Sequence, residues 1–217
     1  IAPEDKCENV RREICLLLEQ MGIYPESSHH EEGPGQNEID FRYSDPLTAA
    51  DNTLTFQAVV KTVAQRNGLY ADFSHQPGNG FHINISVKGG NCEDPLSHMI
   101  AGILEHIPEL TVFLNPTVAS YERFGGPKAP EYISWSNQNR SQLIRVPAAL
   151  DEYRRAELRS PDPTTNPYLA FALLIYAGLD GIQQKLPLPA PTDLNLFTAS
   201  ADILALLQRL PLTLREA

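Results

Sequence analysis

The sequence predicts an α+β domain with a mainly antiparallel sheet, in which one polar face carries the active site and helices pack on the other. Segments with helical apolar periodicity are interleaved with short strand-like runs along the chain. Several of these runs alternate apolar and polar residues with period two, which is typical of a sheet covered on one side only. Helices interleaved with half-covered strands favour an α+β arrangement.

Helices are predicted where apolar stripes follow recognisable start signals. Asp-Pro or Asn-Pro pairs open some of them, because Asp or Asn caps a helix and proline is tolerated at its first position. The expected helices cover approximately residues 4–21, 45–67, 94–114, 166–181 and 201–210.

Strands are predicted where apolar and polar residues alternate between turn signals. The expected strands cover residues 38–43, 70–73, 81–87, 132–146 and 155–159. Residues 27–36 are predicted as a turn that leads into the first strand, and the Pro-rich residues 186–191 as an extended surface segment.

The strand around Glu157 has an unusual concentration of charge. Period two places Arg155, Glu157 and Arg159 on one face, and Ala156 and Leu158 on the other. Burying such charges is costly unless a ligand or partner needs them, so an anion pocket is one interpretation. A solvated edge strand with ion pairs is an equally weighted alternative.

Two further strands share this division into an apolar and a polar face, and so favour an active-site wall. Their polar faces carry Glu38, Asp40 and Arg42 in one strand, and His82, Asn84 and Ser86 in the other.

Composition narrows the class of protein. The 217 residues suffice for one substantial core, and the net charge of −10 argues against a nucleic-acid or acidic-membrane partner. Cys7 and Cys15 lie too far apart on one predicted helix to bridge, so we expect reduced thiols and a cytoplasmic location. Neither a signal peptide nor an apolar run long enough to span a bilayer is recognisable, and Ile1 suggests a piece of a longer polypeptide.

A hard, oxygen-rich set of ligand-type residues is recognisable. Glu31 and Glu38 flank a Gly/Pro turn and are expected to share a cation; His82 and Glu157 complete the set. Such a set fits Mg²⁺ or Mn²⁺ better than zinc, and together with arginines it indicates phosphoryl transfer. The remaining histidines are interpreted as structural or surface residues: His29, His75, His98 and His106.

Several motifs, in order over nearly the whole chain, resemble those of the glutamine synthetase catalytic domain. They are His30-Glu31 with Gln36-Asn37-Glu38-Ile39, Asn79-Gly80-Phe81-His82, Asn115-Pro116-Thr117 with Ser120-Tyr121-Glu122-Arg123, Asn139-Arg140-Ser141 with Arg145, and Arg155-Ala156-Glu157-Leu158-Arg159 with Pro161-Asp162-Pro163 and Asn166-Pro167-Tyr168. We therefore expect residues 1–217 to be part of such a domain, lacking the family's N-terminal β-domain and C-terminal end.

The resemblance implies an ATP-dependent ligase that joins ammonia to the γ-carboxylate of glutamate through γ-glutamyl phosphate. ATP, glutamate and ammonia would be its substrates, Mg²⁺ or Mn²⁺ its metal, and the full-length protein a homo-oligomer. Position by position it implies metal ligands Glu31, Glu38, His82 and Glu157; glutamate contacts Gly78, Arg123 and Arg159; nucleotide contacts Asn84, Ser86, Arg140, Arg145 and Arg155; and catalytic residues Arg140, Arg145 and Arg159.

One departure from the family pattern concerns the residue that handles the ammonia substrate. The family usually has a glutamate just before Ala-Pro, where it binds ammonium and removes its proton, whereas Lys128 precedes Ala129-Pro130 here. A lysine cation repels ammonium and cannot act as a base while protonated. Glu131 is a candidate replacement for the missing glutamate. Two alternative functions remain: a γ-glutamyl-amine ligase that uses an organic amine, and a non-catalytic homologue. Because part of the site is missing, we expect the isolated piece to be weakly active or inactive.

Overall fold

A computed structural model describes residues 5–74, 79–89, 92–126, 128–150 and 153–217. Two compact units make up the chain, Ile1–Phe73 and Ser74–Ala217. The elements of the first unit are α1 (Glu8–Gln20), β1 (Pro25–His30), β2 (Asn37–Phe41) and α2 (Pro46–Arg66). Those of the second are β3 (Ile83–Ile85), α3 (Pro95–Leu114), the 3₁₀ helix η1 (Val118–Arg123), β4 (Trp135–Asn137), β5 (Ile144–Val146), β6 (Ala156–Leu158), α4 (Pro167–Gln184) and α5 (Ala201–Leu204).

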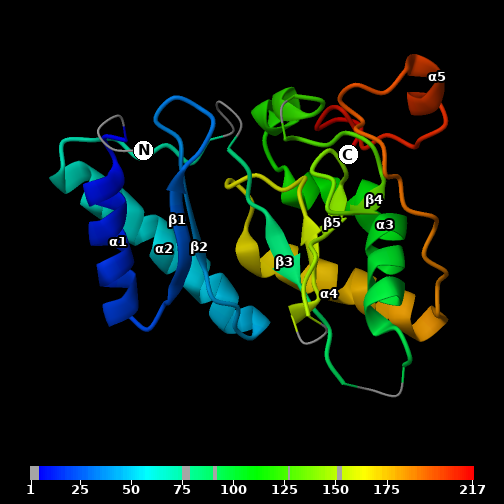
Figure 1. The fold of residues 1–217 in the computed structure, drawn as a ribbon, viewed down its shortest axis with the longest axis horizontal. Coiled ribbons are helices and arrows are strands. Elements are labelled where there is room, and N and C mark those ends of the chain that lie inside the picture. The colour runs from blue at the N-terminus through cyan, green and yellow to red at the C-terminus, as the bar shows by residue number, and fades with distance from the viewer. Residues whose placement is uncertain (1–4, 75–78, 90–91, 127, 151–152) are drawn as a thin grey trace. The chain divides into compact units, whose positions relative to one another are not determined.

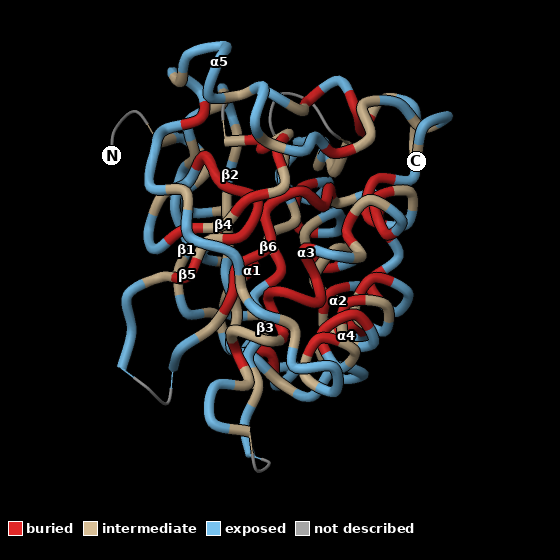
Figure 2. Tube along the Cα trace, turned by 90° about the vertical axis from the view of Figure 1, so that its right-hand side faces the viewer, coloured by how far each residue is buried: buried red, intermediate tan, exposed pale blue. Residues whose placement is uncertain are grey.

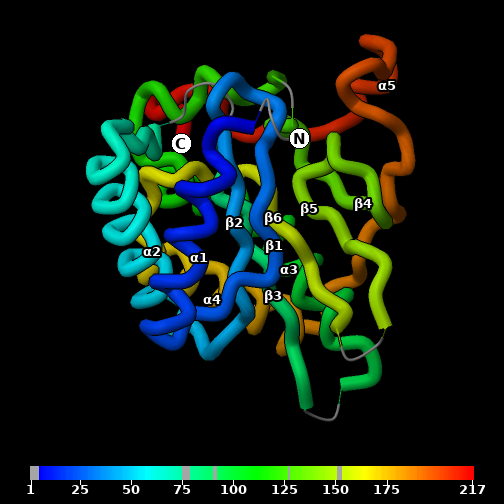
Figure 3. The backbone as a smooth tube through the Cα atoms, turned by 60° about the vertical axis from the view of Figure 1, so that its left-hand side comes forward, coloured from blue at the N-terminus to red at the C-terminus, as the bar shows by residue number. Residues whose placement is uncertain are grey.

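In the first unit, an antiparallel hairpin of β1 and β2 is joined to two helices (Figure 3). Ile14 and Leu18 of α1 pack with Val59 and Val63 of α2, as the predicted apolar stripes require. Ile39, like Phe41, contributes to this core from β2. The hairpin therefore keeps one face for the helices and leaves the other face for polar side chains.

The prediction of a turn over residues 27–36 is wrong in its first part, because β1 extends to His30. The register pairs Ser28 with Ile39 and His29 with Glu38. Runs of serine and histidine have low hydrophobicity, so this half of the hairpin carries no apolar alternation by which it could be recognised. Its partner strand supplies the hydrogen bonds that make it a strand.

The second unit contains a four-stranded sheet in the order β3-β6-β5-β4. Figure 1 labels three of its strands, β3, β5 and β4. Strand β6 is antiparallel to both β3 and β5, whereas β4 and β5 are parallel. The predicted α+β class is confirmed, and the mainly antiparallel sheet is confirmed in part.

Helices α3 and α4 pack against the apolar face of this sheet. Ile144 of β5 and Leu158 of β6 join Ile103 of α3 and Leu174 of α4 in one core. Figure 2 shows many buried residues along β6 and α3. The predicted N-caps are confirmed, since side chains accept hydrogen bonds from backbone N–H groups at the start of their helices: Asp45, Asp94 and Asn166.

Several predicted strands are shorter than expected or missing. Residues 70–73 form no strand, and the strand predicted over 81–87 is reduced to Ile83–Ile85. The run 132–146 divides into β4 and β5. The segment between them returns the chain to the end of the sheet where β4 begins, so the two strands run parallel. Helix α5 ends at Leu204 rather than Leu210, whose backbone N–H instead donates to the Glu131 carbonyl.

No helix in the described ranges combines the length and the apolar character needed to cross a membrane.

Substituting Gly102 with alanine should weaken the packing between α3 and α4. A Cβ at this position would lie 2.2 Å from the Ala177 carbonyl oxygen and 2.8 Å from the Gly181 Cα. Overpacking of this kind costs about 1–3 kcal/mol, measurable as a loss in the free energy of unfolding by denaturant titration. Exposed Glu105 on the same helix offers a control, and Glu105→Ala should change stability by less than about 0.5 kcal/mol. Equal stability for both variants would contradict close backbone packing here.

The ion pair between His106 of α3 and Asp180 of α4 should make stability depend on pH. Its N–O distance is 3.0 Å, and the hydrogen bond to Asp180, aided by Glu109, raises the pKa of His106. A raised folded-state pKa means that the stabilisation is complete below the ordinary pKa of 6.5 and disappears as pH rises through the folded-state value. The difference in melting temperature between the unmodified chain and His106→Gln should therefore shrink from about pH 5.5 to 9. A constant difference over this range would refute the linkage.

Candidate active site

The polar face of the second unit's sheet is centred on Glu157. Its carboxylate is buried, although it lies on the side of β6 opposite to the apolar core. Oε2 accepts a hydrogen bond from Arg145 Nε at 2.5 Å, and Oε1 accepts one from Arg159 Nη1. His82 Nδ1 lies 3.4 Å from Oε1. The structure thus brings together four residues predicted for the site.

Strand pairing explains this convergence. Because β6 is flanked on both sides, Glu157 lies directly opposite Asn84 of β3 and Arg145 of β5. Directly opposite residues share a face of the sheet, so three separate chain segments deliver their polar side chains to one row. The strand-face prediction for Arg155, Glu157 and Arg159 is confirmed at Glu157, since Ala156 and Leu158 belong to the core.

The electrostatics of this row favour an ionised Glu157 and a neutral His82. Burial is the largest influence on Glu157 and opposes its ionisation, but the positive charges of Arg159 and Arg145 outweigh it, so the pKa of Glu157 is lowered. Burial, reinforced by the same guanidinium groups, lowers the pKa of His82 to about 3. A neutral imidazole and a carboxylate are the forms that bind metal ions.

Backbone carbonyl groups hold Arg159 and one further predicted arginine, Arg123. Arg159 Nε donates to the Arg140 carbonyl at 3.1 Å, and Arg123 Nη1 donates to the Ser160 carbonyl. Arg123 is buried, and burial lowers its pKa to about 10, which still leaves it protonated at neutral pH. A Cβ on Gly80 would lie 3.0 Å from His82 Nε2 and 3.3 Å from Arg123 Nη2, so a larger residue there would crowd both side chains.

Of the residues predicted to contact nucleotide, Asn84 and Arg145 lie in the polar row itself, directly opposite Glu157. Arg155 Nε donates to Asn84 Oδ1 at 3.0 Å. The side chains of Ser86, just beyond β3, and of Arg140, before β5, are exposed. Gly78, predicted to hold glutamate, lies outside the described residues.

Sequence reasoning assigned no role to Asp162 or Tyr121, although both sit in a buried polar group with Arg123. Burial and the neighbouring Asp162 raise the pKa of Tyr121 to about 12. Within the described part of the chain, Arg123 Nε, Asp162 Oδ2 and the Tyr121 hydroxyl have no hydrogen-bond partner. Buried polar atoms of this kind call for water or a ligand. Only burial reveals this group, and burial cannot be read from the Pro-Asp-Pro motif.

The first unit carries the other two predicted metal ligands, Glu31 and Glu38. With His29 they form a cluster in which one ligand atom from each residue lies within 4.8 Å of the others. The interpretation of His29 as a surface residue therefore overlooked a neighbour of the predicted ligands. The signal was its spacing, two residues before Glu31, which places both on one face of an extended chain. The four predicted ligands thus fall in two pairs, one in each compact unit.

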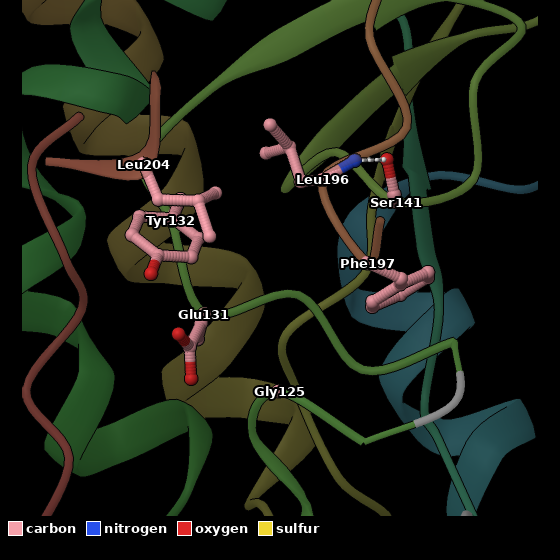
Figure 4. Close-up of a pocket in the computed structure, with 7 residues that line it drawn as sticks. All are labelled: Gly125, Glu131, Tyr132, Ser141, Leu196, Phe197 and Leu204. Carbon is pink, nitrogen blue, oxygen red and sulfur yellow. Dashed lines mark hydrogen bonds between the residues drawn. The ribbon is translucent and has the colours of Figure 1, made fainter. Parts of the chain in front are cut away.

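A cavity of about 200 Å³ lies in the second unit (Figure 4). Ser141 Oγ, at its wall, accepts a hydrogen bond from the Leu196 N–H at 2.9 Å. Its lining includes Glu131, the candidate replacement for the missing glutamate, but none of the predicted metal ligands or arginines; the lining residues are Gly125, Glu131, Tyr132, Ser141, Leu196, Phe197 and Leu204.

Glu131, the candidate replacement for the missing glutamate, is engaged elsewhere. Arg209 Nη2 donates to its Oε1 at 2.8 Å and lies over the Tyr132 ring. A Cβ on Gly125 would come within 2.5 Å of Glu131 Oε2, so that carboxylate packs tightly against the loop backbone. Lys128 itself has a positive φ of 60°.

Comparison with known protein families shows to which family this chain belongs. The family model described as "Glutamine synthetase, catalytic domain" matches residues 1–217. The chain belongs to the glutamine synthetase catalytic-domain family. A glutamine synthetase of Clostridium saccharobutylicum is 48% identical and aligns with 91% of this chain, and one of Methanosarcina mazei is 48% identical over 92% of it. In both cases the match covers 48% of the relative, so the chain spans about half their length.

A solved structure supports the same fold. The protein described as "GmaS/ADP complex-Conformation 1" is 31% identical and superposes with a TM-score of 0.87, covering 99% of this glutamine synthetase-family chain and 54% of the other. The resemblance predicted from the ordered motifs is confirmed.

Substituting Glu157 with glutamine should destabilise the glutamine synthetase-like domain strongly. Removing the carboxylate leaves Arg145 and Arg159 without their shared counter-charge, and breaking a buried ion pair costs about 3–5 kcal/mol. Denaturant titration of the free energy of unfolding would measure this loss. Glu122→Gln, at an exposed position, is the matched control and should cost less than about 0.5 kcal/mol. A loss below about 1 kcal/mol for Glu157→Gln would contradict a shared buried counter-charge.

Proposed function

We propose that this chain is part of the catalytic domain of an ATP-dependent ligase that joins ammonia to the γ-carboxylate of glutamate through γ-glutamyl phosphate. The observation that carries the proposal is the row centred on Glu157, in which a buried carboxylate, an imidazole and guanidinium groups share one sheet face in a member of this family. Such a row suits a reaction in which negative charge on a transferring phosphoryl group must be neutralised.

The residues present fit a divalent cation. Glu157 and the neutral His82 lie within reach of one ion, and Glu31 and Glu38 form a second group of oxygen ligands. Mg²⁺ and Mn²⁺ both accept such ligands. Bound there, the ion would offset the charge of the ATP phosphates. The arginine partners of Glu157 keep its carboxylate ionised and oriented, which is the state that a metal ligand requires.

The arginines divide into two proposed roles. Arg140 and Arg145 would neutralise the transferring phosphate, since a guanidinium group binds phosphate through a planar pair of donors. Arg123 and Arg159, with Gly78, would hold glutamate. The unpartnered, buried Nε of Arg123 supports this assignment, because a carboxylate oxygen would satisfy it.

Nucleotide binding is assigned to residues in the polar row and in the segments next to it. Asn84, Ser86 and Arg155, with the two phosphate-contacting arginines, are the proposed contacts. The similar GmaS structure is an ADP complex, which supports a nucleotide site in this fold. A cytoplasmic homo-oligomer is the proposed form of the full-length protein, because membership of this family favours an oligomer and free cysteines favour the cytoplasm.

Lys128 favours a second candidate, a γ-glutamyl-amine ligase that uses an organic amine. The glutamate expected before Ala129 is absent, and Glu131 is paired with Arg209 rather than available as a base. Without a carboxylate to bind ammonium, the site lacks one basis for preferring ammonia to an organic amine.

Phosphate release by the full-length protein, with ATP, glutamate and Mg²⁺ or Mn²⁺, tests both candidates. Ammonia should support turnover if the first is correct, and methylamine, ethanolamine or a polyamine should do so selectively if the second is. The absence of phosphate release that depends on either kind of nucleophile would contradict both.

Arg145→Lys should lower kcat of that reaction about 100-fold, or about 2.7 kcal/mol in activation free energy, because lysine keeps the charge but loses the planar fork. Arg154→Lys provides the control, since Arg154 is exposed and has no proposed role. Equal kcat values for the two variants would contradict the role of Arg145.

A further inference from the structure

Residues 186–196 follow α4 and run along β4, and we call them the strap. Strand β4 is the last in the sheet order, and an edge strand has backbone groups that its sheet leaves unpaired. The strap covers this edge, because the Thr192 N–H donates to the Trp135 carbonyl and Trp135 Nε1 donates to the Pro189 carbonyl, each at 2.8 Å. The strap is therefore tied to the sheet although it contains no helix or strand.

Ser141 joins the end of the strap to the turn that carries Arg140. Its buried hydroxyl accepts a hydrogen bond from the Leu196 N–H at 2.9 Å, as Figure 4 shows. The same hydroxyl donates to Asn139 Oδ1 at 2.9 Å, and Asn139 Nδ2 donates to the Leu194 carbonyl, also at 2.9 Å. The residues immediately before and after Arg140 are thus both bonded to the strap.

The backbone at Arg140 is also held from the polar face of the sheet. Its carbonyl oxygen accepts a hydrogen bond from Arg159 Nε at 3.1 Å, and Arg159 is itself paired with Glu157. Gln138, two residues earlier, has a φ of 73°, in the left-handed region that residues other than glycine seldom adopt. Such a conformation persists only where surrounding contacts hold it, and it is common at functional sites. These contacts together fix the place from which the exposed Arg140 side chain extends.

We propose that Ser141 is a positioning residue for Arg140: by bonding the turn to the strap, it sets the place from which the Arg140 guanidinium group meets the transferring phosphoryl group. This rests on the proposed function, in which Arg140 neutralises that phosphoryl group. A donor stabilises developing charge best when it is held in place beforehand, and a displacement of about 1 Å can cost about 100-fold in rate. The competing explanation is that the bonds of Ser141 only stabilise the fold.

A second buried serine provides a matched control. Ser141→Ala would leave the buried Leu196 N–H without its partner, which is unfavourable, so the turn or the strap should shift. Ser134 is buried as well, but its hydroxyl donates to the Tyr132 carbonyl, at 3.2 Å. Ser134→Ala therefore removes the same chemical group from the same unit without removing a bond to the strap.

Phosphate release by the full-length protein, with ATP, glutamate, the metal and the amine that supports turnover, tests the proposal. Ser141→Ala should lower kcat at least about tenfold, because Arg140 would act on charge that develops in the transition state. The KM for glutamate should stay unchanged, since Arg140 is not one of the proposed glutamate contacts. Ser134→Ala should leave both constants unchanged. Equal kcat values for the two variants would overturn the proposal.

Combining Ser141→Ala with Arg140→Ala shows whether the serine acts through the arginine. In the Arg140→Ala background, Ser141→Ala should lower kcat no further, because the effects of two coupled residues do not add. A purely stabilising role of Ser141 predicts the same fractional loss with and without Arg140. An equal loss in both backgrounds would therefore overturn the proposal.

Asn139→Ala removes another bond between this turn and the strap, and it provides the same test should Ser141→Ala fail to fold. It should lower kcat when Arg140 is present and not in the Arg140→Ala background. An equal loss in both backgrounds would again contradict positioning through the strap.

Arg140→Ala by itself separates this inference from the proposed function. If it lowers kcat while Ser141→Ala and Asn139→Ala do not, Arg140 has its proposed role and only the positioning by the strap is wrong. If Arg140→Ala leaves kcat unchanged, the proposed role of Arg140 fails, and the role of Ser141 fails with it.

Discussion

A carboxylate buried among guanidinium groups is the constraint on which the polar face depends. Glu157 would be costly to bury alone, and Arg145 and Arg159 would repel each other without it. Together they form a neutralised group that the sheet can hold away from bulk water, with the neutral His82 beside it. The same contacts that stabilise this face also keep a ligand-type carboxylate ionised, so stability and proposed chemistry depend on one set of interactions.

The rest of the second unit keeps that row in place. Strand β6 lies between β3 and β5, so Glu157 has a partner on each side, and Ala156 and Leu158 anchor the strand in the core. Gly102 and Gly181 allow α3 and α4 to approach closely beneath the sheet. The hairpin of the first unit follows the same design on a smaller scale, with Ile39 inward and Glu38 outward.

Some helices, strands and site residues could be predicted from the sequence, and others could not. Helices with Asp-Pro or Asn-Pro starts were predicted well, because local capping chemistry determines where they begin. Strand β1 was missed because its pairing partner, rather than its composition, makes it a strand. Period-two alternation correctly placed Glu157 opposite the core, but the burial of Asp162 depends on tertiary contacts that no local pattern encodes.

Anomalous diffraction from crystals of the full-length protein, grown with Mn²⁺ and a non-hydrolysable ATP analogue, tests most directly whether Glu157 is a metal ligand kept in place by arginines. We expect a manganese peak at bonding distance from the Glu157 carboxylate and the His82 imidazole, with Arg145 turned toward the phosphates. A structure with bound nucleotide in which manganese binds away from both the Glu157 carboxylate and the His82 imidazole would contradict it.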